Sequence, residues 1–168
     1  IPYDDDVDFG IHYKDSDKFW NQKKILESCG YGVVYADIGF KMGTGDIIPS
    51  VLSVIDGKQV VIGNKSPFTG TNQDIFLFQE DGSEKGVPVM RYTSERALKT
   101  WPDEVIPISG WFNPTFGLFG DYKVQILPKD ELNWYLNNSY GSNWKTHDNL
   151  GKKINDFSCA KYNKDIIQ

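Results

Sequence analysis

The sequence predicts an α+β protein in which a mixed or antiparallel sheet is flanked by a few helices. Alternating polar and apolar residues, interrupted by short turns that contain glycine, recur along most of the chain and are typical of strands joined as hairpins. Only three segments carry the signals of a helix, and they lie far apart. With 168 residues and 39% apolar content, the chain can bury one sizeable core and is most economically a single domain.

The first predicted strand, over residues 1–11, is acidic. Side chains in a strand alternate between two faces, so Asp4, Asp6 and Asp8 share one face above an apolar underside. Aspartate is a poor strand former and like charges repel, so a sequence that required only a strand would not favour this pattern. A hard divalent ion such as Mg²⁺ or Mn²⁺ resolves the conflict, because it binds carboxylate oxygens. His12 lies on the same strand face, either as a hydrogen-bonding neighbour or as an aid to phosphate binding.

Two alternative interpretations of this segment do not require a Mg²⁺ or Mn²⁺ site. An acidic turn in water, or a frayed terminus, would leave the carboxylates solvated, but the apolar alternation that continues to Ile11 favours a half-buried strand. A calcium loop of the EF-hand type would use Asp4, Asp6 and Asp8 as its first ligands. Its sixth position is then Phe9, where the sharp turn of such a loop requires glycine.

Most of the net negative charge of the chain lies near the start of the sequence. The net charge is −5, and the four aspartates within residues 4–8 account for −4 of it. No cluster of Lys and Arg forms a basic stripe, so the sequence argues against nucleic acid as a partner. No run of about 18 apolar residues is present, so we expect no transmembrane segment in this chain. Cys29 and Cys159 lack the spacing of metal ligands and form at most one bridge.

The next elements are a helix and several strands. Residues 18–28 are expected to form a helix that ends at Gly30, with Phe19, Leu26 and Trp20 facing inward. Strands are then predicted over three segments, the last two joined by an Asp56-Gly57 turn: residues 31–40, 47–55 and 59–62.

Asp74 opens an apolar run, residues 74–78, that is predicted to be a strand entered from a polar loop. Such a residue can lie at a sheet edge beside the acidic strand and provide a third carboxylate ligand. An aspartate in this position is also common as a turn or cap residue. The acidic strand nearby favours the role of a metal ligand for Asp74. Polymerase-type sites hold metal ions with two carboxylates on one strand and a third on its neighbour.

The rest of the chain is expected to hold one more hairpin and two helices. A turn is predicted at 80–82, a helix over 95–101, and a hairpin of strands 116–119 and 122–127. A longer helix follows Pro128 and ends at Gly141. Its apolar side chains recur at helical spacing and are expected to pack in a core; they are Leu132, Tyr135, Leu136 and Tyr140.

Four segments, in order over most of residues 1–145, resemble the LicD/fukutin family. They are Ile-Pro-Tyr-Asp-Asp-Asp-Val-Asp-Phe-Gly (1–10), Asp-Ile-Phe (74–76), the hairpin around Phe-Gly-Asp-Tyr-Lys-Val (119–124) and Tyr-Leu…Tyr-Gly…Trp (135–144). The first motif is specific, and the others support it. The resemblance implies a nucleotidyltransferase-like fold with one catalytic domain over residues 1–145 and a polar tail over 146–168. The family has a helix and a glycine-containing turn before the first motif, so we expect the N-terminal part of that domain to be missing.

The resemblance also implies a metal-dependent phosphotransferase. Such an enzyme moves a substituted phosphate, of the phosphocholine, ribitol phosphate or glycerol phosphate type, from a CDP-linked donor to a glycan hydroxyl, with Mg²⁺ or Mn²⁺ as cofactor. The implied catalytic and metal-binding residues are Asp6, Asp8 and Asp74, and Asp4 is a further acid of the motif. The enzyme would act in the cytoplasm of a bacterium or in the Golgi or secretory lumen of a eukaryote.

A non-catalytic module that binds a metal or a glycan is the second interpretation. It would use exposed aromatic side chains among Trp101, Trp111 and Trp144, and it does not require Asp74 to approach the acidic strand. A separation above about 8 Å between Asp74 and the acidic strand, beyond the reach of one or two bridging ions, would favour this module.

Overall fold

The computed structural model describes residues 8–63, 65–119, 121–142 and 144. The chain divides into two compact units, one of Asp6–Ile108 and one that joins Ile1–Asp5 to Ser109–Gln168. This boundary lies within the domain predicted over residues 1–145, which stays a prediction, and the predicted tail over 146–168 lies outside the described residues. Strands and short helices both contribute to each unit, so the predicted α+β class is confirmed.

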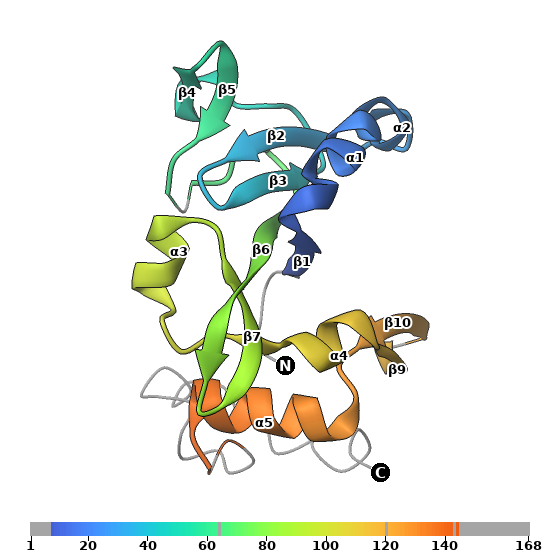
Figure 1. The fold of residues 1–168 in the computed structure, drawn as a ribbon. Helices are drawn as coiled ribbons and strands as arrows, with labels where there is room; N and C mark the ends of the chain where they lie inside the picture. Colours follow the sequence, from blue (N-terminus) through green and yellow to red (C-terminus); the bar gives the residue numbers. More distant parts are fainter. Residues whose placement is uncertain (1–7, 64, 120, 143, 145–168) are drawn as a thin grey trace, which may run out of the picture. The chain divides into compact units, whose positions relative to one another are not determined.

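The larger unit is built on one mixed sheet of eight strands (Figure 1). In sheet order the strands are β4 (Leu52–Ile55), β5 (Lys58–Val61), β2 (Gly32–Ala36), β3 (Gly39–Gly43), β6 (Asn72–Glu84), β7 (Val87–Tyr92) and β8 (Ile106–Pro107), with β1 (Phe9–His12) against β6. Strand β6 is the longest of them and pairs with β3, β7 and β1. The β1–β6 and β2–β5 pairs are parallel, and the others are antiparallel.

Two short helices pack on one face of this sheet. A single turn of 3-10 helix (Tyr13–Asp15) leads into α1 (Ser16–Asn21) and α2 (Lys23–Ser28). Phe19, Trp20 and Leu26 pack against a core of three buried side chains, Val33, Phe40 and Ile75, as the sequence predicts. The predicted single helix over 18–28 is wrong, because the N–H of Gln22 donates to the Phe19 carbonyl at 2.9 Å and this tighter turn divides it.

The single strand predicted over residues 31–40 is wrong. These residues include β2 and the start of β3, which form a hairpin around a turn. The chain reverses at Asp37 and Ile38, within an alternation of side chains that favours one continuous strand. Gly39 follows with φ of +140°, and a Cβ there would lie 2.4 Å from the carbonyl oxygen of Ile75. Only glycine therefore permits β6 to pass so close to this turn.

The β4–β5 hairpin agrees with the sequence at its turn and differs before it. Asp56 and Gly57 have φ values of +48° and +75°, the positive pair that a two-residue hairpin turn requires. The strand predicted over 47–55 begins only at Leu52, because a turn of 3-10 helix occupies Pro49–Val51. Proline cannot donate to a strand ladder, which explains the late start.

Strand β6 includes the run predicted over 74–78 but continues further. The turn predicted at 80–82 is wrong: these residues form a register shift within β6. The chain reverses at Lys85 and Gly86, with φ values of +50° and +80°, and returns as β7, which the sequence did not reveal.

The opposite face of the sheet carries a second group of buried side chains. Val34, Val61 and Phe68 form one cluster, and an aromatic group of Phe76, Phe78, Tyr92 and Trp101 packs near the short helix α3 (Glu95–Thr100). The predicted helix over 95–101 is confirmed, with the Ser94 hydroxyl accepting from the Ala97 N–H at 3.3 Å.

The smaller unit contains α4 (Ile108–Phe112), the β9–β10 hairpin (Thr115–Phe119 and Tyr122–Ile126) and α5 (Lys129–Tyr140). The hairpin and the long helix agree with the sequence to within a residue or two. The stripe expected to form a core in α5 contains no fully buried residue, and Tyr140 is 42% exposed. Among the described residues, no helix is both long and apolar enough to cross a membrane.

Candidate functional site

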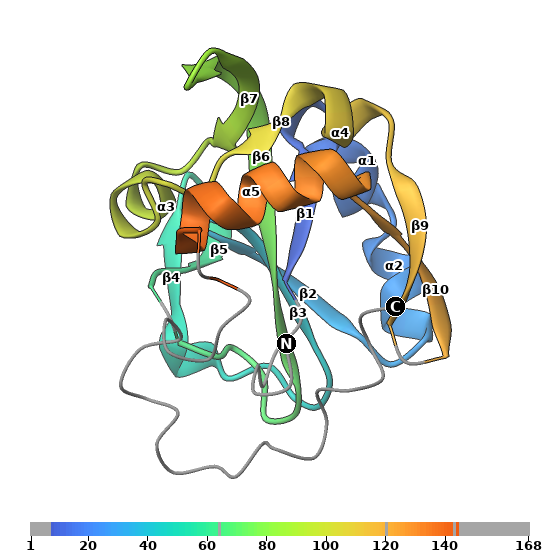
Figure 2. The ribbon, with the colours of Figure 1, turned by 90° about the horizontal axis from the view of Figure 1, so that it is seen from below.

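Of the strand predicted over residues 1–11, the structure describes β1 (Phe9–His12), which is the neighbour of β6, the strand of Asp74. β1 runs parallel to β6, with Phe9 level with Ile75 and His12 level with Phe78 (Figures 1 and 2). Continued back by one residue, this register brings Asp8 level with Asp74. Neighbouring strands lie about 4.8 Å apart, so the two backbones are within the span that one or two ions can bridge.

The two faces of β1 are distinct in their surroundings. Ile11 packs on the core beneath α1 and α2, and His12 is buried, only 9% exposed, on the other face. The Nδ1 atom of His12 accepts a hydrogen bond from the Lys14 N–H at 3.1 Å and so caps the 3-10 turn Tyr13–Asp15. Alternate residues of a strand share a face, so the same alternation continued to Asp8, which directly precedes β1, would put it on the face of His12 and Asp74. Asp8 itself is exposed to solvent.

The other predicted acids are not part of this geometry. Asp4 and Asp6 lie outside the described residues, so the structure gives no separation between them and Asp74. Within the described residues, no three His, Cys, Asp or Glu side chains come together as a metal-binding group. Of the predicted ligands, only Asp8 and Asp74 fall in this part of the chain, so their roles stay predictions.

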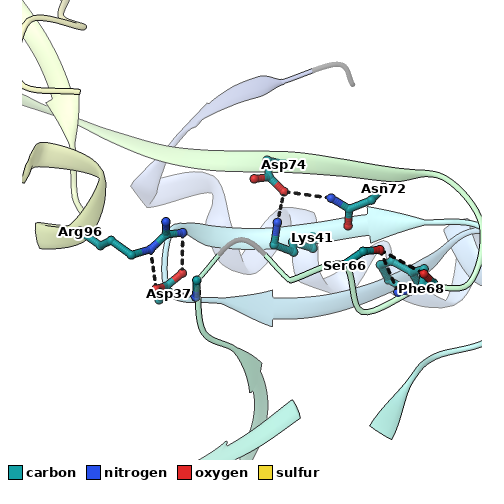
Figure 3. A network of polar contacts seen from close by, with 8 residues as sticks. Asp37, Lys41, Ser66, Phe68, Asn72, Asp74 and Arg96 are labelled. Atoms are coloured by element: carbon teal, nitrogen blue, oxygen red, sulfur yellow. Dashed lines mark hydrogen bonds and ion pairs between the residues drawn. The ribbon is translucent and has the colours of Figure 1, made fainter. Parts of the chain in front are cut away.

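Asp74 has a cationic partner that the sequence did not reveal. Lys41, on β3, is in register with Asp74 on β6, and its ammonium donates a hydrogen bond to Oδ1 of Asp74 (Figure 3). The side chain of Lys41 is 2% exposed and that of Asp74 is 16% exposed. The lysine is therefore enclosed in the protein, and the carboxylate is the part of the pair that solvent reaches.

Asn72 completes a small polar group on the same face. Its Nδ2 atom lies 3.4 Å from the same Oδ1 of Asp74, which is a long contact for a hydrogen bond (Figure 3). Its own Oδ1 atom is buried without a hydrogen-bond partner among the described residues. No contact is found there for Oδ2 of Asp74 either. This face thus holds two acceptor oxygens that make no hydrogen bond within the described residues, and the Oδ1 atom of Asn72 is the buried one of the two.

A second ion pair fixes the edge of this region. Arg96, on α3, donates to both carboxylate oxygens of Asp37 at 2.7 and 3.0 Å (Figure 3). Asp37 also accepts from the Gly63 N–H at 3.2 Å. This bidentate contact holds α3 against the turn between β2 and β3. It belongs to the framework around the candidate site.

One of these contacts has a signal in the sequence. Lys41 interrupts the strand Gly39–Gly43 between Phe40 and Met42, and a lysine in so apolar a setting indicates a buried charge that needs a partner. No comparable signal links Asp37 to Arg96, because neither stands out from its neighbours.

The tryptophans of the alternative binding module are not exposed. Trp101, Trp111 and Trp144 are all partly buried, and Trp101 packs edge-on against Phe76 with ring centroids 5.6 Å apart. This corrects the expectation of exposed aromatic side chains at these positions.

Comparisons with protein-family models, with curated proteins and with solved structures find no match for this chain.

Proposed function

We propose that this protein is a metal-dependent phosphotransferase with a nucleotidyltransferase-like fold. It moves a substituted phosphate from a CDP-linked donor to a glycan hydroxyl, as the resemblance to the LicD/fukutin family implies. The observation that supports the proposal is the parallel pairing of β1 with β6, in which Phe9 is level with Ile75, so that Asp8 and Asp74 are the residues directly before the first paired positions of the two strands. Clustered acids that directly precede one strand, beside a neighbouring strand that carries one more, would suit phosphoryl transfer.

The residues available at this place suit a hard divalent ion. Asp6, Asp8 and Asp74 would hold Mg²⁺ or Mn²⁺, and the Oδ2 atom of Asp74, which has no partner within the described residues, is a donor atom of the kind such ions prefer. When bound, the ion neutralises charge on the donor diphosphate.

The transfer itself is a displacement at phosphorus. The glycan hydroxyl oxygen attacks the phosphorus atom of the transferred group, and the bond from that phosphorus to the bridging oxygen of CMP breaks. Asp74 or Asp8 accepts the hydroxyl proton, and the donor leaves as CMP. These carboxylates contribute by aligning the hydroxyl with the phosphorus and by taking up the proton.

Release of CMP tests the proposal. The protein is incubated with a panel of CDP-linked alcohols and Mn²⁺, with and without glycan acceptors. CMP is expected to appear with at least one donor and to vanish in EDTA. The Asp74→Asn variant should release none, and the exposed acid Asp17 of α1, changed to Asn, is the matched control. No CMP from any donor, together with no metal-dependent binding of CDP, would contradict the proposal.

The ion pair of Asp74 favours a second candidate, a non-catalytic module that binds a metal or a carbohydrate. Lys41 already provides Asp74 with a cation, which is what a purely structural carboxylate requires. In that case a metal would bind with the same affinity in the presence and absence of CDP.

A further inference from the structure

Lys41 is the most completely enclosed charged side chain among the described residues, and it lies behind the candidate site. Its backbone on β3 is in register with Asp74 on β6. On the other side of β3, it is in register with Val34 on β2. A charge in this setting is weakly screened by salt and solvent. Its electric field therefore extends into the space above Asp74, where an ion or a phosphate would bind.

The contact also limits how Asp74 can bind a metal. Oδ1 accepts from the Lys41 ammonium and lies near Nδ2 of Asn72, while Oδ2 has no partner in the described part of the chain. A carboxylate with one oxygen engaged in this way has only the other to offer an ion. Asp74 would thus bind through a single oxygen.

The charge of Lys41 acts in opposite directions on the two ligands of the proposed site. A cation next to a carboxylate lowers the affinity of that carboxylate for a second cation, since like charges repel. The same charge raises the affinity for an anion such as a diphosphate. A residue with a merely structural role would have no such opposite effects.

We propose that Lys41 is a positioning residue of the site. It holds Asp74 by one oxygen, weakens binding of the metal ion alone, and strengthens binding of the anionic donor, so that metal and donor enter together. The inference rests on the proposed function, because it assumes that both ligands bind beside Asp74.

Calorimetric titration of Lys41 variants tests this role. Each protein is titrated with Mn²⁺ alone, and then with CDP at saturating Mn²⁺. Lys41→Gln keeps a hydrogen-bond donor for Asp74 and removes the charge, and Lys41→Arg keeps the charge. Arg96→Gln removes the cation of the partly buried ion pair with Asp37 in the same unit. We expect Lys41→Gln to bind Mn²⁺ about fivefold or more tightly and CDP about fivefold or more weakly. Lys41→Arg and Arg96→Gln should remain near the wild type for both ligands.

Other results overturn the inference in distinguishable ways. If Lys41→Gln weakens both ligands together, or changes neither, Lys41 does not act as proposed, while the proposed function stands. If the wild type shows no metal-dependent binding of CDP, the proposed function fails and this inference fails with it.

Two further measurements apply if Lys41→Gln does not fold. Lys41→Met is a second neutral variant of similar length. In the wild-type protein with ¹⁵N-labelled lysine, the ammonium signal of Lys41 should shift when Mg²⁺ is added, and an unchanged signal would overturn the inference.

Discussion

The ammonium of Lys41 and the carboxylate of Asp74 face each other across two neighbouring strands, with the lysine enclosed and the aspartate reached by solvent. The pair places one positive charge directly beneath the candidate acidic site. Removing either partner leaves a buried or half-buried charge without its counterion. The first prediction follows from the loss of stability that such an unpaired charge causes.

Lys41→Met should destabilise the protein by about 3 kcal/mol, because Asp74 loses its counterion in a largely buried setting. The double variant Lys41→Met Asp74→Leu should recover much of that loss, since no charge is then left unpaired. Urea unfolding of the single and double variants measures both values. A double variant as unstable as the sum of its single changes would show that the two side chains do not act as a pair.

Asp6→Asn and Asp8→Asn are each expected to abolish CMP release while the protein stays folded. In EDTA the variants should melt at the same temperature as the wild type or higher, because neutralising one of several clustered carboxylates reduces their repulsion. Circular dichroism with and without EDTA gives the melting temperatures. Variants that are unfolded in both conditions would mean that these acids serve the fold.

Metal and donor should each tighten the binding of the other by one common factor. Two or three carboxylates fill only part of the coordination shell of Mg²⁺, and a donor diphosphate completes it. Coupling of this kind typically amounts to about 1–3 kcal/mol, or roughly 5- to 150-fold in affinity. Calorimetric titration of Mn²⁺ with and without CDP measures the factor, and titration of CDP with and without Mn²⁺ must return the same value. Identical Mn²⁺ isotherms in the two conditions would contradict the phosphotransferase.

Gly39→Ala should destabilise the protein by about 2 kcal/mol or more and weaken metal binding as well. The new Cβ would lie 2.4 Å from the Ile75 carbonyl oxygen and 2.9 Å from Cγ of Leu77, so β6 must move. Gly57→Ala is the matched control, because φ is also positive there but no atom lies within 4 Å. Its cost should be about 1 kcal/mol. Equal losses of stability for the two variants in urea would show that the approach of β6 to Gly39 is not a tight constraint.

The sequence predicts the elements whose signals are local. The turn at Asp56-Gly57 and the cap at Ser94 depend on residues within a few positions of each other, and both are confirmed. The reversal at Asp37 and Ile38 lies within an alternation that favours a strand, and contacts distant in the chain stabilise it: Ile38 is buried and Asp37 accepts from Arg96. Interactions over that range are fixed by packing and cannot be inferred from neighbouring residues.

The candidate site likewise has parts that the sequence predicts from local patterns and parts that depend on contacts distant in the chain. The acidic face of the first strand and the aspartate at residue 74 can be proposed from the alternation of side chains alone. That β1 pairs directly with β6 depends on how the intervening hairpins fold. The partnership of Lys41 with Asp74 depends on the register between β3 and β6, which no pattern within either strand specifies.

The parallel pairing of β1 with β6 also bears on the order of assembly. Phe9 pairs with Ile75, although α1, α2, the β2–β3 hairpin and the β4–β5 hairpin all lie between them in the sequence. Contacts so distant along the chain carry a large loop-closure entropy and tend to form late. Asp8 and Asp74 would therefore be level only in a chain that has already folded most of this unit. A partly folded or truncated chain would carry the same carboxylates but no shared site for an ion, so metal binding should appear together with native structure and not before it.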